Sequence, residues 1–144
     1  MPVTPLPDTG HGASVTFGTS SWAGKILGIP TNLAIRREPV NKSNLGTSGQ
    51  EEFIAGDLES LGEITLDVLF EAGRGLPATT TTAETVTITW PLNPSDGSAT
   101  AANLAGTALI TGTNYPALQT GQIQTGQITI KFDGGTGPTW TNAA

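Results

Sequence analysis

The stretch LGTSGQEEFIAGDLESLGEITLDVLF, residues 45–70, decides the fold of this chain. In its second part every second residue is apolar: Ile64, Leu66, Val68 and Phe70. Such period-two alternation is typical of a β-strand with one buried face. Its first part is polar, contains glycines, and is too long for a tight turn between strands. We therefore predict a strand at residues 62–71 that follows a long polar arm at about residues 41–61.

The predicted arm carries a few spaced apolar residues among its charges. The arm residues that we expect to make assembly contacts are Leu45, Glu51, Glu52, Phe53, Ile54 and Asp57. Large apolar side chains are unfavourable in water, so a polar loop that carries them usually docks on another surface. Gly56 and the short length of QEEFIAGDL disfavour a stable helix there. We predict that the arm docks on another copy of the chain.

Several other short segments alternate in the same way and are separated by glycine, proline and threonine. Strands are expected at 13–18, 32–40, 85–90, 108–115 and 122–133. In the second of these we expect Leu33 and Ile35 to point inward, and Pro39 to end the ladder or to hold it at an edge. Short strands at irregular spacing predict an all-β, mainly antiparallel fold, a two-sheet β-sandwich or barrel.

The remaining segments complete the predicted domain organisation. Alanines cluster in ATAANLAG, residues 99–106, and predict one short flanking helix closed by Gly106. Residues 1–12 are expected to form a flexible arm, because Pro2, Pro5 and Pro7 interrupt regular structure. The β-domain then covers residues 13–134, and residues 135–144 form a flexible, glycine-rich tail.

Composition excludes several classes of function. The 144 residues are enough for one domain with a core, and only 12% are charged. The net charge of −6 disfavours a nucleic-acid-binding face, which needs clustered lysine and arginine. No run of 18 apolar residues and no secretory leader is recognisable, so we expect a soluble protein without membrane contact. The absence of cysteine fits folding in a reducing compartment.

Catalytic chemistry finds little support in the sequence. His11 is the only histidine and there is no cysteine, so an imidazole–thiolate metal site is not available. Five carboxylates lie within thirteen residues: Glu51, Glu52, Asp57, Glu59 and Glu63. Paired acids can hydrolyse glycosides, but such clefts hold sugars with aromatic side chains, which make up only 6% of this chain. We expect no enzymatic activity, no metal, no cofactor and no small-molecule substrate.

The order of the segments resembles the tail tube (major tail) proteins of long-tailed bacteriophages and of related contractile devices. The matching pieces span about residues 12–134, and they are GASVTFG, LAIRREPVNKSNLGTSG, EEFIAGDLESLGEITLDVLF, TVTITWP and TGQITIKFDG. Each piece taken alone is an ordinary strand sequence next to a glycine or a turn. The resemblance is carried by their order, their spacing and the arm between them.

The resemblance implies a structural virion protein. Six copies would form a ring whose inner sheets join into one β-barrel, and the rings would stack into a hollow tail tube through which phage DNA passes. The arm would reach the next ring or the neighbouring subunit and bury Phe53 and Ile54. Other tail proteins would be its partners, and the tail would be assembled in the cytoplasm of the bacterial host.

Charge and alternation suggest which residues would line such a tube. Six copies at −6 would carry about −36 per ring, and a negative wall would repel DNA and prevent sticking. The residues that we expect to face the lumen are Glu63, Asp67, Glu71, Gln122, Gln124 and Gln127.

Two alternatives to a tube protein remain open at this point. A carbohydrate-binding or adhesin-like β-sandwich would need an exposed aromatic platform. We expect Trp22 and Trp90 in the core, which leaves Tyr115 and Trp140 for such a platform. A small glycosidase would need two of the clustered acids in one cleft.

Overall fold

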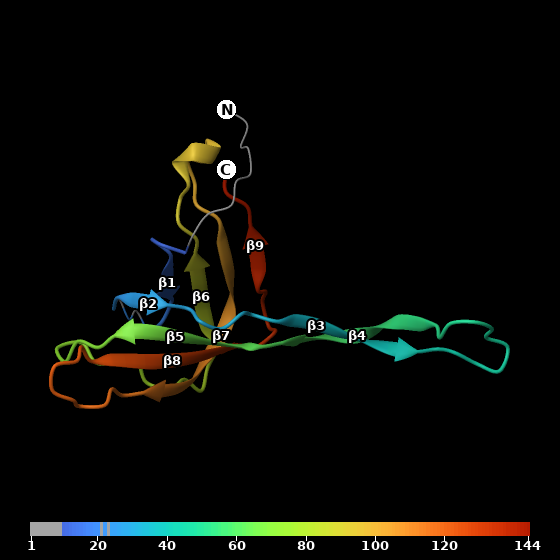
Figure 1. Cartoon of the computed structure of the whole chain (residues 1–144), viewed down its shortest axis with the longest axis horizontal. Coiled ribbons are helices and arrows are strands. Elements are labelled where there is room, and N and C mark those ends of the chain that lie inside the picture. The colour runs from blue at the N-terminus through green and yellow to red at the C-terminus, as the bar shows by residue number, and fades with distance from the viewer. Residues whose placement is uncertain (1–9, 21, 23) are drawn as a thin grey trace.

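The computed structural model describes residues 10–20, 22 and 24–144, which form an almost entirely antiparallel β-structure. Seven strands make one curled sheet, and two more make a ribbon that projects from it (Figure 1). The strands are β1 Ser14–Phe17, β2 Ile26–Gly28, β3 Ile35–Asn41, β4 Phe53–Leu61, β5 Glu63–Leu69, β6 Glu84–Thr89, β7 Asn103–Asn114, β8 Thr125–Phe132 and β9 Thr139–Thr141.

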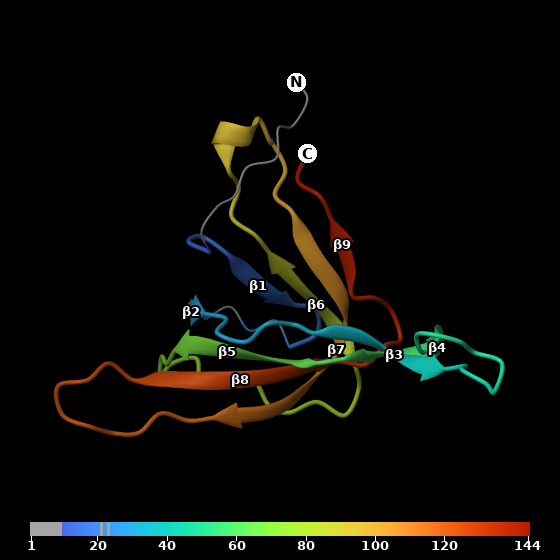
Figure 2. The ribbon, with the colours of Figure 1, turned by 45° about the vertical axis from the view of Figure 1, so that its right-hand side comes forward.

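The curled sheet has the order β1-β6-β7-β8-β5-β2, and β9 also pairs with β7. Strand β7 is long enough to pair with β6 and β9 through its first half and with β8 through its second half. A register shift between Ile110 and Gly112 accompanies the change of direction. The sheet therefore bends into a half-barrel, with β1, β6 and β9 in one wall and β5 and β8 in the other (Figure 2). This confirms the predicted all-β, mainly antiparallel class.

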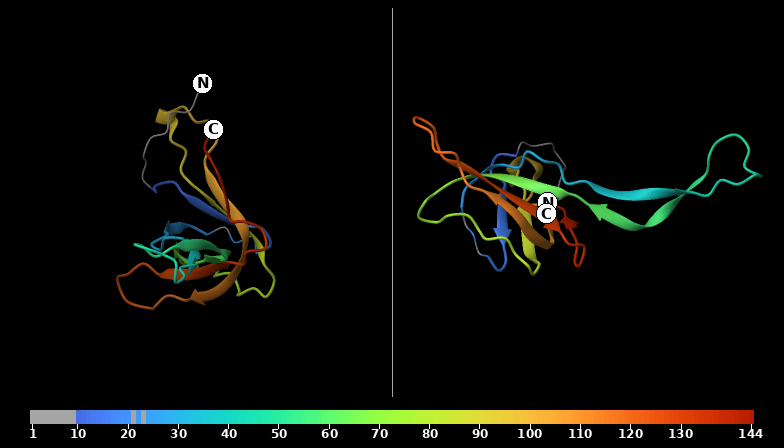
Figure 3. Two further views of the ribbon diagram at one scale, coloured as in Figure 1. Left: turned by 90° about the vertical axis from the view of Figure 1, so that its right-hand side faces the viewer. Right: turned by 90° about the horizontal axis from the view of Figure 1, so that it is seen from below.

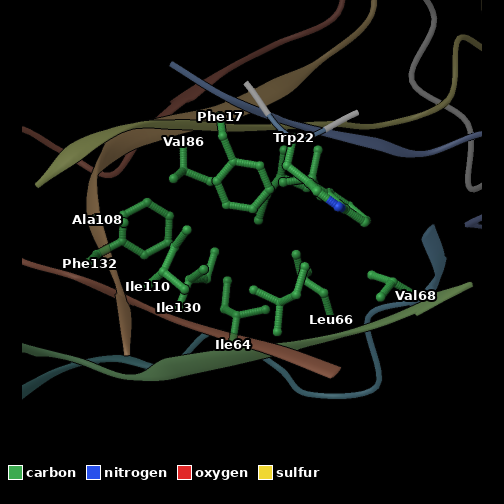
Figure 4. Close-up of a cluster of buried hydrophobic side chains, with 13 residues drawn as sticks. Phe17, Trp22, Ile64, Leu66, Val68, Val86, Ala108, Ile110, Ile130 and Phe132 are labelled. Atoms are coloured by element: carbon green, nitrogen blue, oxygen red, sulfur yellow. The ribbon is translucent and has the colours of Figure 1, made fainter. Parts of the chain in front are cut away.

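The core fills the concave side of the half-barrel (Figure 4). Strands β1, β5, β6, β7 and β8 contribute alternate residues to it, such as Leu66 from β5, Ile130 from β8 and Val86 from β6, all fully buried. Trp22 lies over the core, with its ring edge-on to Phe17, and its indole Nε1 donates a 2.9 Å hydrogen bond to the carbonyl oxygen of Gly75. The predicted inward faces of the strands at 13–18 and 62–71, and the burial of Trp22, are confirmed.

The predicted flanking helix is wrong. Strand β7 begins at Asn103, inside the segment expected to be helical, and pairs with β6. Cross-strand pairing outweighs the helix propensity of the alanines, which is a weak preference. Gly106 does not cap a helix, because it lies within β7 and pairs with Val86; a Cβ there would lie 2.8 Å from the Pro138 Cα. The helix that the described residues contain is a three-residue 3-10 turn, η1, at Pro94–Asp96.

Two expected core residues lie at the surface instead. Trp90 follows the last residue of β6 and is 40% exposed. Ile35 begins β3, which belongs to the projecting ribbon, and its side chain is half-exposed. Leu33, which precedes the ribbon, packs against the core as expected. Pro39 lies in a strand with a free edge, as the second of its two expected placements requires.

The ends of the chain differ in part from the prediction. Residues 1–9 of the expected N-terminal arm lie outside the described residues, and residues 10–13 form a turn in which the Ala13 amide donates to the Gly10 carbonyl. The expected C-terminal tail contains strand β9. Its last carbonyl, that of Ala144, accepts hydrogen bonds from the amides of Ala99 and Thr100. Among the described residues no helix could span a membrane.

Candidate assembly surface

The predicted polar arm is the outer part of a β-hairpin. Strand β3 pairs antiparallel with β4, and their connection at residues 42–52 is the tip of the hairpin. Figure 3 shows this hairpin reaching far beyond the half-barrel. Only Gly62 separates β4 from β5, which belongs to the curled sheet, so the base of the hairpin is attached to that sheet. The expectation of an irregular arm is corrected, because both strands are regular although neither buries a face. We call residues 35–61 the hairpin arm.

A bulge near the middle of the hairpin arm requires glycine. The pairing register shifts between Arg37 and Pro39, and a Cβ on Gly56 would lie 2.3 Å from the carbonyl oxygen of Glu38. Arg37 also spans the bulge. Its Nη1 donates to the Gly56 carbonyl at 2.7 Å, and its Nη2 lies 3.0 Å from Glu59 Oε1. A close backbone approach and a local ion pair therefore fix the shape of the arm.

Apolar side chains are exposed on both faces of the hairpin arm. Val40 lies directly opposite Ile54, so their side chains share one face of the ribbon. Leu58 lies farther along β4, in the segment where the register shifts. Phe53 points to the other face. Val40, Ile54 and Phe53 are half-exposed, and Leu58 is 84% exposed. The exposed apolar groups are therefore arranged so that surfaces on either side of the ribbon could cover them.

The hairpin arm lacks the support that a stable β-ribbon needs. Strands β3 and β4 pair only with each other, which leaves two free edges with unpaired backbone groups. An isolated two-stranded hairpin is at best marginally stable in water, and free edges invite pairing with another chain.

The structure separates the predicted arm residues into two groups. Phe53, Ile54 and Asp57 lie on β4, whereas Leu45 lies in the tip and is fully exposed. Glu51 and Glu52 lead into β4, and the Glu52 carbonyl accepts a hydrogen bond from the Lys42 amide that closes the tip. Val40 and Leu58 were not among the predicted arm residues. No alternation of apolar and polar residues marks them, because neither β3 nor β4 buries a face in the single chain.

Three of the six predicted lumen residues lie together on the convex face of β5 and β8. Gln127 Nε2 donates to Asp67 Oδ1 at 3.1 Å, and Gln127 Oε1 accepts from Asn114 Nδ2 at 3.2 Å. Glu63 lies opposite Lys131 in the register. This convex face is thus rich in hydrogen-bonding groups, and one of its two acidic groups, Glu63, lies opposite a basic residue.

The other three predicted lumen residues are outside this face. Gln122 and Gln124 lie in the loop between β7 and β8, because β8 begins only at Thr125. Glu71 lies beyond the end of β5, in a turn where its Oε2 is 3.6 Å from Arg74 Nη2. The alternation that placed these residues on a strand continues past the point where the strand ends.

The clustered carboxylates do not converge on a cleft. They follow one another along the extended β4–β5 segment and its lead-in, and Glu59 is paired with Arg37. The described residues contain no group of three or more side chains placed to hold a metal ion. The predicted aromatic platform is also divided, since Trp140 packs edge-on against Trp90 and Tyr115 packs against Phe70.

One carboxyl group has a shifted pKa and serves a structural purpose. The Thr107 hydroxyl donates to Asp133, which lowers the pKa of this carboxyl, and the Gly135 amide adds a second hydrogen bond to the same oxygen. Asp133 follows β8 directly, so these bonds hold the turn that leads towards β9. The Asp133 carboxyl group is exposed to solvent.

Comparison with known proteins shows which molecules share this fold. No family profile and no curated protein sequence matches the chain. A chain of the anti-feeding prophage cap, a tube-terminating cap, has a TM-score of 0.69 at 16% identity over 99% of this chain and 96% of its own. A chain of the sheath–tube complex of an extracellular contractile injection system in the extended state has a TM-score of 0.63 at 14% identity over 97% and 93%.

A third similar structure comes from the tail of an empty gene transfer agent particle. One of its chains has a TM-score of 0.62 at 13% identity, over 92% of this chain and 99% of its own. The likeness extends over nearly the whole length in every case. The fold of this chain is therefore shared with chains of phage-like tail particles, in agreement with the resemblance seen in the order of its segments.

Proposed function

We propose that this chain is a structural subunit of a phage-like tail or injection particle, in which copies assemble into rings that stack as a hollow tube. The observation that carries the proposal is the hairpin arm, a regular β-ribbon that projects from a complete core with exposed apolar residues and free edges. Such an element has a physical reason to exist only if another surface covers it. The shared fold supplies the class of particle.

The contact made by the arm is heterologous. The arm projects away from its own half-barrel (Figure 1), which supports a contact with a surface of a different copy. Contacts of this kind close into rings or continue as filaments, depending on the rotation between copies. The gene transfer agent tail was described with C6 symmetry, and a baseplate with a similar chain was 6-fold symmetrised. These symmetries support a six-membered ring for this chain.

The convex face of β5 and β8 is the proposed lumen wall. Its Asp67–Gln127–Asn114 network binds water well and offers no cluster of lysine and arginine to grip phosphate. Lys131 lies opposite Glu63, so this wall acts through hydration more than through a strongly repulsive charge. DNA would pass along it without lasting contacts. Assembly would take place in the host cytoplasm, and the mature tube would lie in the particle's tail.

Deletion of residues 43–56 tests the proposal. It removes the tip and the outer half of the arm but keeps the Arg37–Glu59 pair at the base. We expect a variant with the wild-type melting transition that stays monomeric in sedimentation velocity, where the full chain forms rings or tubes. A variant that assembles like the full chain would refute the role of the arm. Loss of the folded domain would show instead that the arm belongs to the core.

A further inference from the structure

An open apolar groove lies between the two walls of the half-barrel. Its volume is about 880 Å³, and it is bordered by β1, β2, the end of β6 and β9. Leu27, Trp90 and Trp140 line it and remain substantially exposed. The lining residues include no aspartate, glutamate, lysine or arginine, and His11 at the N-terminal border is the only titratable side chain among them. An uncharged occupant fits this groove, since a charged one would lose hydration without gaining a partner.

The chain enters the described structure at the groove. Gly10, His11 and Gly12 all belong to its lining. The turn closed by the 3.2 Å bond from the Ala13 amide to the Gly10 carbonyl reverses the chain, and Gly12 adopts a positive φ of 95° within it. A Cβ on Gly12 would lie 3.4 Å from the Pro91 side chain, next to Trp90. The turn at residues 10–13 therefore lies at the groove, beside the segment that contains Trp90.

The sequence before this turn suits an aromatic-lined groove. Residues 2–7 read PVTPLP, with prolines at positions 2, 5 and 7 and no charged side chain. Prolines fix φ near the value of the polyproline II helix, so such a segment loses little entropy on binding. Grooves lined by aromatic side chains are the usual receptors for proline-rich segments of this spacing. Six residues would span about 19 Å in that conformation.

We propose that residues 2–7 bind in this groove of the same chain as an extended, proline-rich segment. Only Asp8 and Thr9 separate Pro7 from the groove border at Gly10. So short a tether gives the segment a high effective concentration at its own groove, which favours this over exchange with another copy. The segment covers Trp90, Trp140 and Leu27 before any assembly takes place. This goes beyond the proposed function and does not depend on it.

Disulfide trapping tests the proposal in the full chain, which has no cysteine of its own. The variant Leu6→Cys/Leu27→Cys joins the segment to the groove, and the control Leu6→Cys/Leu118→Cys uses an even more exposed leucine, which lies in the β7–β8 loop. At concentrations where the chain is monomeric, mild oxidation should give an intrachain disulfide in the first variant and little in the control. Equal yields in both, or a disulfide between chains, would overturn the proposal.

Tryptophan fluorescence gives a second measurement that requires no change in the groove. Replacing Pro2, Pro5 and Pro7 with serine removes the polyproline preference, while the control Thr4→Ser/Thr9→Ser leaves it. We expect the proline variant to show a red-shifted emission and stronger acrylamide quenching, because Trp90 and Trp140 lose their cover while Trp22 stays buried. Identical emission and quenching in the proline variant and the wild type would contradict the proposal.

Discussion

Replacing Leu58 with serine should weaken assembly without weakening the fold. Leu58 lies on β4, is 84% exposed, and is the most exposed large apolar side chain of that strand. Nothing in the single chain gains from its burial, so the free energy of unfolding of the monomer should stay within about 0.5 kcal/mol of the wild type, as for other surface substitutions. Any larger effect must come from the contact between copies.

The size of the assembly effect follows from that exposure. Burying a whole leucine side chain contributes about 1.5–3 kcal/mol. Since nearly all of this side chain is accessible in the single chain, its cover by a neighbour is worth about 2 kcal/mol. Every 1.4 kcal/mol is a factor of ten in an equilibrium constant, so the critical concentration for assembly should rise roughly 30-fold.

The assay is light scattering or pelleting of the purified protein over a range of concentrations, with circular dichroism melts on the same samples. Leu118→Ser serves as the matched control, because Leu118 is 80% exposed but lies in the β7–β8 loop, away from the arm. Equal thresholds for Leu58→Ser and the wild type would refute the reasoning. So would a Leu118→Ser variant shifted as far as Leu58→Ser.

Other substitutions distinguish the contribution of the arm to assembly from the contribution of the core to stability. Gly56→Ala places a methyl group against the Glu38 carbonyl and should abolish assembly with an unchanged melting transition; tubes with wild-type thresholds would contradict this. Leu66→Ala should lower the free energy of unfolding, measured in urea, by about 2–5 kcal/mol. A decrease below about 1 kcal/mol would contradict the burial of Leu66 in the core. Because the folded-state pKa of Asp133 is lowered, its carboxylate stabilises the fold above the unfolded-state pKa, and this contribution is lost as the pH falls through the folded-state value. Asp133→Asn should therefore flatten the acid limb of the stability–pH curve, and parallel curves would argue against it.

The sequence predicts those strands that bury one face, because burial of one face makes apolar and polar residues alternate along the strand. Strand β5 is the clearest case, since Ile64, Leu66 and Val68 are fully buried and every intervening residue is not. The second strand of the hairpin arm could not be found in this way. Strand β4 buries neither face in the single chain, so no alternation of apolar and polar residues marks it.

Features that depend on distant segments were also missed. The alternation predicts Trp90 as the last inward residue of a strand. In the structure it follows the last residue of β6 and lines the groove, where it packs against Trp140, fifty residues later in the chain. The sequence predicts His11 as part of a flexible N-terminal arm, but in the structure His11 lines the same groove. The groove joins the N-terminal turn, β2 and β9, and no local pattern links these three segments.

The most direct test of the central claim is electron microscopy of the purified full chain over a range of concentrations. The account predicts rings with six-fold symmetry at the assembly threshold and stacked hollow tubes above it, with the hairpin arm of each copy lying on a neighbour. Particles that stay single at every concentration, or closed dimers in which two arms pair with each other, would contradict it.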